Sequence, residues 1–571
     1  MGAGKMLIWG AGRIGRGFVA DLFQQAKYQL SFVDADSALV QGLKDAGKYT
    51  VLRITGKDQT SSTVIDNFDI LLGSEKEAVG KVLQECTLMS VCVFPTVFED
   101  VAVALVPELE KRAKLNSPLP LDILICANTN HPSALMRACF DGKLSEKGQK
   151  YFEEKVGLID TAVMRMAIMP NPSQVEMDPF IVVTNGYEEM PADAAAFKGT
   201  KPDIPGMIFV NDMRAEETRK MYTYNMLHAL YAYVGQLRKL EFVYDCTQNK
   251  TVQEVADGAL DEVCSALSKE FGYSDAEMTK WKGLVLRNMA NPALMDKLVR
   301  VGGDPARKLK RDDRLVGPAL LCRKNGIMPY FLSKAIAAGF IFDNPGDPSS
   351  EKIRSHVEGQ GIKSAIREYC KLDQELELIQ LISEQYQKLL KGTALDEDQE
   401  RINTIKKAYA LGFKYEKTIK GCAQCTLAAL SEVAGATDEN LFKAASGLSG
   451  GIAITGDGSC GGYVGGVLYM GSLAGRRMDR IPVDGDKIAQ YKSYVMAQKL
   501  HDRFIDSYGS ITCADIHKGI FGKAYNLRTK EVREEFEAAG AHADKCTTVI
   551  AMESAWVAEL LLDEGLWPLS K

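Results

Sequence analysis

The sequence predicts an α/β doubly wound domain, then an all-α domain, then a mainly α-helical C-terminal domain that contains cysteines. Three observations predict this order. A glycine-rich turn follows a short apolar strand at the start, and short apolar runs alternate with amphipathic segments up to about residue 195. From about 213 to 390 nearly every segment has helical periodicity. The polar stretch 391–400 then marks a boundary, so we expect domains at 1–200, 201–392 and 400–571.

The first domain is expected to contain a mostly parallel sheet. Its apolar runs are short and are separated by stretches long enough for a crossover helix. The runs expected to form strands are 5–9, 30–34, 70–72, 88–94, 121–126 and 180–184. Such alternation is typical of a doubly wound sheet with helices on both faces.

A Gly-x-Gly-x-x-Gly motif lies between the first strand and the first helix. It consists of Gly10, Ala11, Gly12, Arg13, Ile14 and Gly15. In a Rossmann domain the first glycine makes the tight turn, the second lets pyrophosphate approach the backbone, and the third lets helix and strand pack closely. Asp34 ends the second strand, 19 residues after Gly15, where a carboxylate would accept from the ribose hydroxyls and repel a 2′-phosphate. NAD is therefore the expected cofactor, and a glycine turn that binds no dinucleotide is the less favoured interpretation.

Composition excludes several classes of protein. The 571 residues are too many for one core, and 46% hydrophobic with 25% charged residues is ordinary for a globular chain. A net charge of −6 argues against a nucleic-acid partner. No apolar run approaches the roughly 18 residues that cross a membrane. The 13 scattered cysteines suit a reducing compartment, so we expect a cytoplasmic protein.

Lys220, Asn225 and His228 are the candidate catalytic group. At about 100° per residue of a regular α-helix, Asn225 lies roughly 140° and His228 roughly 80° from Lys220, so all three can face one cleft. A base, an amide and an imidazole could then act on one alcohol without a metal. On the helix alone, a solvated lysine and a core histidine would be the ordinary interpretation. The glycine motif, which predicts a bound dinucleotide, favours the catalytic interpretation instead. No histidine pair has zinc-ligand spacing.

The first 390 residues or so resemble the polyol-specific long-chain dehydrogenases. The matching blocks are 10–17, 156–163, 197–199, 204–207, 219–235, 291–292 and 307–315. The resemblance implies hydride transfer between NAD and a secondary alcohol of a polyol, polyol phosphate or sugar acid. It implies Lys220 as general base, Asn225 with Asn128 as donors to the reacting oxygen, and His228 as the residue that orients a neighbouring hydroxyl.

Two positions depart from the family pattern. Ala127 and Met164 stand where the family has acids, and a thioether removes a polyol contact. We therefore expect the substrate to differ from the family's usual polyol. Its phosphate or carboxylate would be bound by a basic run, normally a solvated helix face, that contains Arg307, Lys308, Arg311 and Arg314.

The C-terminal domain resembles a putative redox-active family named for a cysteine, a Cys-Gly-Ala-x-x-Gly motif and two further cysteines. The matching positions are Cys422, Cys460, Cys513 and Cys546, with Gly462 in place of the motif's alanine and Cys425 as an extra cysteine. Four thiolates suit an iron–sulfur cluster or zinc. Buried thiols and a redox disulfide stay open as alternatives, as does a Cys422–Cys425 redox pair. Because hydride moves two electrons and a cluster accepts one, we expect a structural, assembly or sensing role.

Two functions of different class follow. The first is a dehydrogenase acting on a small-molecule polyol, sugar phosphate or sugar acid. The second is an NAD(H)-binding redox sensor or metal-binding protein with little turnover. The helical extension is also the surface that we expect to support a homodimer.

Overall fold

The computed structural model describes residues 4–56, 59–127, 129, 131–436 and 438–567. The chain divides into two compact units. The first comprises Met1–Lys220 together with Leu286–Met295, and the second comprises Met221–Val285 with Asp296–Lys571. A short segment from the middle of the chain therefore belongs to the N-terminal unit, which the sequence did not indicate. The predicted boundaries near 200 and 392–400 stay predictions.

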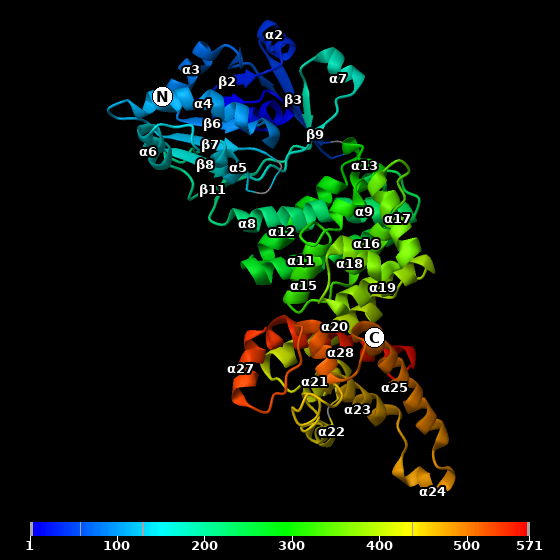
Figure 1. The fold of residues 1–571 in the computed structure, drawn as a ribbon. Coiled ribbons are helices and arrows are strands. Elements are labelled where there is room, and N and C mark those ends of the chain that lie inside the picture. The colour runs from blue at the N-terminus through cyan, green and yellow to red at the C-terminus, as the bar shows by residue number, and fades with distance from the viewer. Residues whose placement is uncertain (1–3, 57–58, 128, 130, 437, 568–571) are drawn as a thin grey trace. The chain divides into compact units, whose positions relative to one another are not determined.

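A six-stranded parallel sheet forms the centre of the first unit (Figure 1). Its strands are β1 (Lys5–Trp9), β2 (Gln29–Asp34), β5 (Phe68–Leu72), β6 (Leu88–Val91), β7 (Leu121–Ile125) and β8 (Val156–Asp160). The strand order is β5-β2-β1-β6-β7-β8, and every neighbouring pair is parallel. This is the Rossmann strand order, in which the sequence order of the strands reverses between β1 and β6 although all strands are parallel. The predicted doubly wound fold is confirmed.

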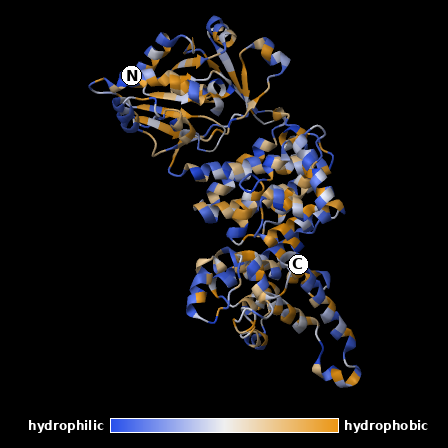
Figure 2. Cartoon of the chain, in the orientation of Figure 1, coloured by the Kyte–Doolittle hydropathy of each residue, from blue (hydrophilic) through white to orange (hydrophobic). Residues whose placement is uncertain are grey.

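Two apolar layers cover the two faces of this sheet. On β1, Met6 and Ile8 join one buried cluster, whereas Leu7 and Trp9 join the other. This alternation follows from the period of two along a strand. The strands are accordingly mostly orange in the hydropathy view (Figure 2). The covering helices are η1 (Gly15–Val19), α1 (Ala20–Gln25), α2 (Ser37–Ala46), α3 (Lys76–Glu85), α4 (Phe98–Ala113), α5 (Pro132–Ala138) and α6 (Glu146–Lys155).

The predicted strand at 180–184 does not join the main sheet. It forms β10 (Val182–Thr184) in a four-stranded sheet of order β4-β3-β10-β9. The other members are β3 (Tyr49–Gly56), β4 (Gln59–Ile65) and β9 (Ala167–Ile168), and two more strands, β11 (Met190–Asp193) and β12 (Met207–Val210), pair with each other. Our expectation was wrong here because an apolar run predicts a strand but not its partner. Ile181 and Val183 pack with Ala293 and Leu294 of the inserted segment.

The described part of the second unit is helical, as predicted for 213–390. Its first helices are η3 (Met221–Asn225), α9 (Met226–Leu237), α10 (Val243–Gln248), α11 (Lys250–Phe271), α13 (Leu298–Gly302), α14 (Pro305–Lys308), α15 (Val316–Lys324), α16 (Tyr330–Ile341), α17 (Pro348–Gln360), α18 (Ile362–Cys370) and α19 (Leu376–Leu390). Helix α12 (Asp275–Met289) runs into the segment that belongs to the first unit.

The C-terminal part of this unit is built round the packing of α20 on α28. The helices are α20 (Gln399–Thr418), α21 (Cys422–Ala434), α22 (Glu439–Ala444), α23 (Gly461–Ala474), α24 (Ile481–Asp484), α25 (Lys487–Tyr508), α26 (Cys513–Phe521), α27 (Lys530–Ala538) and α28 (Cys546–Asp563). Gly465 and Gly466 of α23 permit close packing, since a Cβ on either would overlap the backbone of α21 or the Glu553 carboxylate. Within the described residues, every helix is too short or too polar to cross a lipid bilayer.

Candidate nucleotide and catalytic site, and a cysteine-lined cavity

The glycine motif forms a tight loop at the carboxyl end of β1. Gly10 has a φ of +103°, which a residue with a side chain rarely adopts. A Cβ on Gly15 would overlap the Gly10 carbonyl oxygen, whereas a Cβ on Gly12 would meet no atom within 4 Å. Two glycines thus serve the fold, and Gly12 leaves the open space that a pyrophosphate needs.

Asp34 lies beside this loop. Its Oδ2 accepts from the Ala11 N–H at 2.7 Å, and its Oδ1 accepts from the Asp36 N–H at 3.0 Å. Arg16, which the sequence did not indicate, connects the loop to a distant segment. It donates to the Ala11 carbonyl at 2.7 Å and to the Phe180 carbonyl at 2.6 Å. Burial lowers the pKa of Arg16. The open space over Gly12 and the carboxylate at the end of β2 fit a dinucleotide.

We predict opposite outcomes for alanine at two of these glycines. Gly12→Ala should weaken NADH binding by about tenfold or more without changing the melting temperature, because its methyl group enters only the open space. Gly15→Ala should lower the melting temperature, because its methyl group overlaps backbone. NADH fluorescence titration and calorimetry measure the two effects. Equal melting temperatures for both variants would contradict this division of roles.

Lys220 ends α8 (Met213–Lys220) in the first unit. Its Nζ donates to the Val163 carbonyl at 2.8 Å, three residues beyond the end of β8. Gly10 follows β1 and Asp34 ends β2. The Val163 carbonyl, Gly10 and Asp34 therefore all lie at the carboxyl ends of strands of one parallel sheet. Ligands of open α/β sheets bind at this edge. Met164, next to the accepting carbonyl, is 4% exposed.

The helix is not uniform between Lys220 and His228. Residues Met221–Asn225 form a π-helical segment, η3, so the spacing of 100° per residue that we assumed is wrong here. The boundary between the two units also falls after Lys220. A widened turn of this kind is frequent at functional sites. The amphipathic pattern of the sequence did not indicate this segment.

Asn225 and His228 both belong to the second unit. The Asn225 amide donates to Met221 Sδ at 3.3 Å. His228 Nε2 lies 3.4 Å from Asp296 Oδ2. Burial opposes ionisation of Asp296, but His228 and Arg300 together outweigh it and lower the pKa of Asp296. Asn128 lies outside the described residues.

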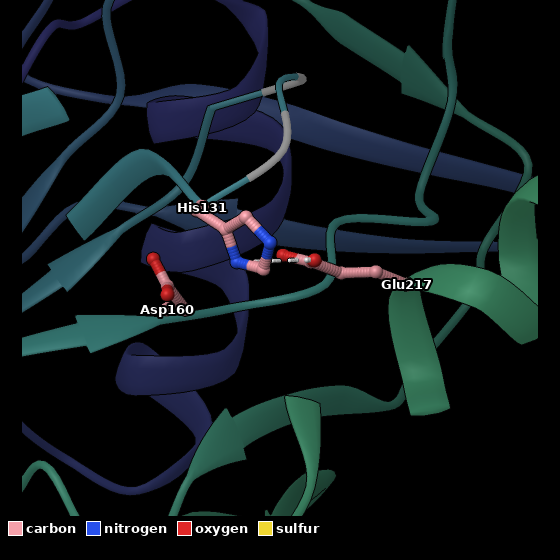
Figure 3. Close-up of side chains that lie close together, drawn as sticks. All are labelled: His131, Asp160 and Glu217. Carbon is pink, nitrogen blue, oxygen red and sulfur yellow. Dashed lines mark ion pairs between the residues drawn. The ribbon is translucent and has the colours of Figure 1, made fainter. Parts of the chain in front are cut away.

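Glu217 and His131 are site residues that the sequence analysis missed. Glu217 lies three residues before Lys220 on α8, and His131 Nδ1 is 3.9 Å from its carboxylate (Figure 3). Together with Asp160 they place ligand atoms within 4.8 Å of one another. Burial, then Asp160, raises the pKa of Glu217, which His131 and Lys220 lower. Both Asp160 oxygens accept from Ser133, each at 2.7 Å. The i, i+3 spacing from Lys220 was the available signal.

The basic run has carboxylate partners. Arg307 lies 3.1 Å from Asp304, Arg311 lies 2.7 Å from Glu375, and Arg314 lies 2.7 Å from Asp313. Lys308 is 5% exposed and donates to the Gly303 carbonyl. Burial, reinforced by Arg307 and Arg314, lowers the pKa of Lys308 to about 8.

A cavity of about 570 Å³ in the C-terminal region brings together the four predicted cysteines. Cys422 begins α21, Cys460 precedes α23, Cys513 begins α26 and Cys546 begins α28, and all four line the cavity. Cys425 is buried nearby but does not line it. All the described cysteines are free thiols. Convergence of residues more than 120 positions apart goes beyond chance burial of small apolar side chains.

Glycines make room round these sulfurs. A Cβ on Gly461 would overlap Cys422 Sγ, and the Gly450 N–H donates to the same sulfur at 3.4 Å. Gly450 begins five consecutive residues with positive φ, ending in Ile452, Ala453 and Ile454. Left-handed L-residues cost roughly 1–2 kcal/mol each. Strained backbone of this kind clusters at functional sites.

Burial makes these thiols hard to ionise without a nearby cation. It raises the pKa of Cys422 to about 11 and that of Cys513 to about 12, and it raises the pKa values of Cys460 and Cys546 well above the ordinary value. His517, which the sequence analysis also missed, places Nε2 3.5 Å from Cys513 Sγ and 3.8 Å from Cys546 Sγ. Its i+4 position relative to Cys513 was the signal.

Three family models match consecutive parts of the chain. The mannitol dehydrogenase Rossmann domain matches residues 4–206, the mannitol dehydrogenase C-terminal domain matches 212–390, and the putative redox-active protein C_GCAxxG_C_C matches 421–560. The resemblances inferred from the sequence are confirmed.

Relatives and solved structures agree with these matches. Mannitol-1-phosphate 5-dehydrogenase of Geobacillus stearothermophilus is 30% identical over 383 residues, 67% of this chain and 98% of the relative, and that of Brevibacillus brevis is 29% identical over 382 residues, 67% and 97%. A crystal structure of D-sorbitol dehydrogenase has a TM-score of 0.61 at 14% identity, covering 69% of this chain and 94% of that one. The structure of Pseudomonas fluorescens mannitol 2-dehydrogenase, in a ternary complex with NAD and D-mannitol, has a TM-score of 0.52 at 16% identity. It covers 69% of this chain and 93% of that one.

These two structures share the fold. The G. stearothermophilus enzyme matches this chain over almost its whole length. The chain therefore belongs to the mannitol dehydrogenase family, and its residues 421–560 match the model of the putative redox-active protein C_GCAxxG_C_C.

Proposed function

We propose that the protein is an NAD-dependent dehydrogenase that interconverts a secondary alcohol of a polyol, polyol phosphate or sugar acid with its ketone, with Lys220 as general base and no catalytic metal. One observation carries the proposal. The Lys220 ammonium is held 2.8 Å from the Val163 carbonyl, at the sheet edge that bears the glycine loop. A protein that only bound NAD(H) would have no use for a base positioned at this edge.

Each residue has a defined part in the proposed reaction. Gly10–Gly15 and Asp34 would bind NAD, which supplies the hydride acceptor. Lys220 Nζ, in its neutral form, takes the hydroxyl proton of the substrate. The Asn225 and Asn128 amides donate to the oxygen on which negative charge develops; removing one such donor elsewhere costs about 3 kcal/mol. His228, whose Nε2 lies 3.4 Å from Asp296 Oδ2, orients a neighbouring hydroxyl.

Glu217 and His131 would connect Lys220 to solvent as a proton-transfer path. Burial raises the pKa of the Glu217 carboxylate, although the charges of His131 and Lys220 act on it in the opposite direction. The His131 side chain is 65% exposed and lies 3.9 Å from that carboxylate. We propose that protons pass from Lys220 through Glu217 and His131 to water. The Lys220 ammonium also supplies positive charge at this cluster, which disfavours a metal ion there.

The family relatives guide the choice of substrate. The relatives from Geobacillus stearothermophilus and Brevibacillus brevis are named for a phosphorylated polyol, and this chain has a basic run from Arg307 to Arg314. A screen that follows NADH absorbance with matched pairs of polyols and polyol phosphates, and with uronates, tests the proposal. Turnover on one of these classes supports it. NADH binding with no turnover on any of them would favour the alternative, a redox sensor that binds NAD(H).

The pH dependence of KM should identify the phosphate contact. Because the pKa of Lys308 is about 8, this side chain loses its positive charge as pH rises above that value. The KM for a phosphorylated substrate should therefore rise above about pH 8, while the KM for the unphosphorylated polyol should not. Lys308→Arg keeps its charge at every accessible pH and should abolish the rise. An identical pH profile for both substrates would remove Lys308 from the proposed phosphate site.

We further propose that the C-terminal cavity holds an iron–sulfur cluster bound by Cys422, Cys460, Cys513 and Cys546. Thiolates at about 2.3 Å from one tetrahedral zinc ion would lie about 3.8 Å apart. Among the described residues, the group with three ligand atoms mutually within 4.8 Å is His131, Asp160 and Glu217, not these cysteines. A cluster spreads its ligands over several iron atoms and suits the wider spacing.

Metal analysis and a visible spectrum of anaerobically purified protein test the cluster. Iron and sulfide in equal amounts, lost in Cys460→Ser, support it. Zinc, or no metal after reconstitution with iron and sulfide, would contradict it. The role that fits is structural or sensing, because hydride delivers two electrons at once.

A further inference from the structure

His517 has the closest contact with the sulfurs among the cavity's basic side chains. It lies on α26, one turn after Cys513, and its Nε2 is 3.5 Å from Cys513 Sγ and 3.8 Å from Cys546 Sγ. His542 also lines the cavity, but its ring nitrogens face Glu416 at 3.6 Å and Glu537 at 2.8 Å. The two histidines therefore have different chemistry: one faces carboxylates and the other faces sulfur.

The other side of the His517 ring is apolar. Phe521, Tyr525 and Phe536 pack round it, with ring centroids 5.3, 6.0 and 5.1 Å away. Nδ1 is buried and makes no hydrogen bond to any described residue. These aromatic contacts fix the ring so that Nε2, and not Nδ1, faces the two sulfurs.

This environment determines which nitrogen carries the proton. A histidine that binds a metal through Nε2 has its proton on Nδ1, and that N–H almost always donates to a carboxylate, a carbonyl or water. Here such a donor would be buried among aromatic rings without an acceptor, and Nε2 would face two cluster-bound sulfurs that carry no proton to donate to it. With the proton on Nε2, the N–H points at two sulfur acceptors, so the contacts favour a donor over a ligand.

The two sulfurs also cannot share one ion with the imidazole as they are placed. Cys513, Cys546 and His517 are not among the described groups with ligand atoms mutually within 4.8 Å, whereas two sulfurs on one ion lie closer than twice the metal–sulfur distance of about 2.3 Å. The cavity thus offers four thiols as ligands and one imidazole that contacts two of them.

We propose that His517 is a positioning residue that donates its Nε2–H to the Cys513 and Cys546 sulfurs of the cluster and so raises the reduction potential of that cluster. The inference rests on the proposed cluster. Hydrogen bonds to the sulfurs of a cluster are one of the factors that set its potential. They stabilise the reduced form more, because that form carries one more negative charge, and the one-electron couple moves to a less negative value.

Three variants of the full-length protein, reconstituted with iron and sulfide, test this role. His517→Phe keeps an aromatic ring among Phe521, Tyr525 and Phe536 but removes the N–H. His517→Gln keeps an N–H donor of similar reach. His501→Phe is the matched control, since its ring lies in the same region with 43% side-chain exposure beside Asp502 and does not line the cavity. The measurements are iron content, the visible spectrum, and the midpoint of a redox titration with dithionite.

We expect all four proteins to bind the same amount of iron. His517→Phe should lower the equilibrium constant for one-electron reduction by about tenfold, a shift of about 59 mV to more negative potential. His517→Gln should recover part of that shift, and His501→Phe should match the wild type.

The opposite outcomes are distinct. An unchanged midpoint in His517→Phe, with full iron content, overturns the role of His517 and leaves the cluster standing. Loss of iron in both His517 variants, but not in His501→Phe, shows a ligand and likewise overturns the role. A wild-type protein that takes up no cluster contradicts the proposed metal centre, and the inference about His517 with it.

Discussion

Lys220→Ala should reduce kcat by about 10² to 10⁴-fold, the range found when a general acid or base is removed. NADH binding should persist, because the glycine loop and Asp34 keep their contacts with each other. The fall in kcat is expected because, without Lys220, the hydroxyl proton has no acceptor while the hydride leaves. Small primary amines added to the assay should restore part of the rate, since they can enter the space left by the lysine side chain. Stopped-flow absorbance of NADH at saturating substrate measures the hydride step itself.

Two further variants separate charge from basicity. Lys220→Arg retains a cation but not a usable base, because guanidinium does not lose its proton in proteins. It should be as inactive as Lys220→Ala. Lys250→Ala, at a side chain that is 91% exposed, should leave kcat and KM unchanged. Substantial turnover in Lys220→Ala without added amine would remove Lys220 from the reaction, whatever the state of the cofactor site.

Asp21→Asn should be the most destabilising of the conservative substitutions in the first unit. The Asp21 carboxylate on α1 is fully buried, and both its oxygens bind guanidinium groups, those of Arg53 on β3 and Arg165 after β8. Burial lowers the pKa of Arg165 despite this carboxylate. Removing one partner of a buried ion pair costs about 3–5 kcal/mol, because the remaining charge stays buried without compensation. Hydrogen exchange of β3 and α1, and the first calorimetric transition, measure the loss.

An exposed ion pair of the same unit provides the control. Lys5 and Glu85 lie 2.5 Å apart, with side chains 46% and 40% exposed. Water solvates either charge when the partner is removed, so Glu85→Gln should leave hydrogen exchange and the melting temperature as they are. Similar destabilisation by Glu85→Gln and Asp21→Asn would show that burial does not set the cost.

Local patterns in the sequence identified much of this protein. The glycine motif after an apolar strand predicted a Rossmann sheet, and its glycines occur in the structure where backbone sterics require them: φ of +103° at Gly10 and a backbone overlap at Gly15. Helical periodicity predicted the helices of the second unit. The resemblance to a family named for its cysteines predicted a common site for four of them, and all four line one cavity. These features depend on residues near one another in sequence or on strong family motifs.

Other features depend on contacts between distant residues. The strand at 180–184 joined a second sheet, because its partner β3 lies about 130 residues earlier and an apolar run does not indicate a partner. Glu217, His131 and His517 gain their importance only from neighbours that the fold supplies. The π-helical turn after Lys220 and the return of Leu286–Met295 to the first unit belong to the same class.

The sequence by itself therefore determined the cofactor-binding fold, the candidate base and the set of sulfur residues, because each depends on backbone sterics or residue chemistry that short motifs carry. Only the tertiary structure decided which carbonyl holds Lys220, which charges surround Glu217 and which imidazole faces the sulfurs. The physical reason is that burial and electrostatic environment are properties of side chains brought together from distant parts of the chain, and no local pattern contains them.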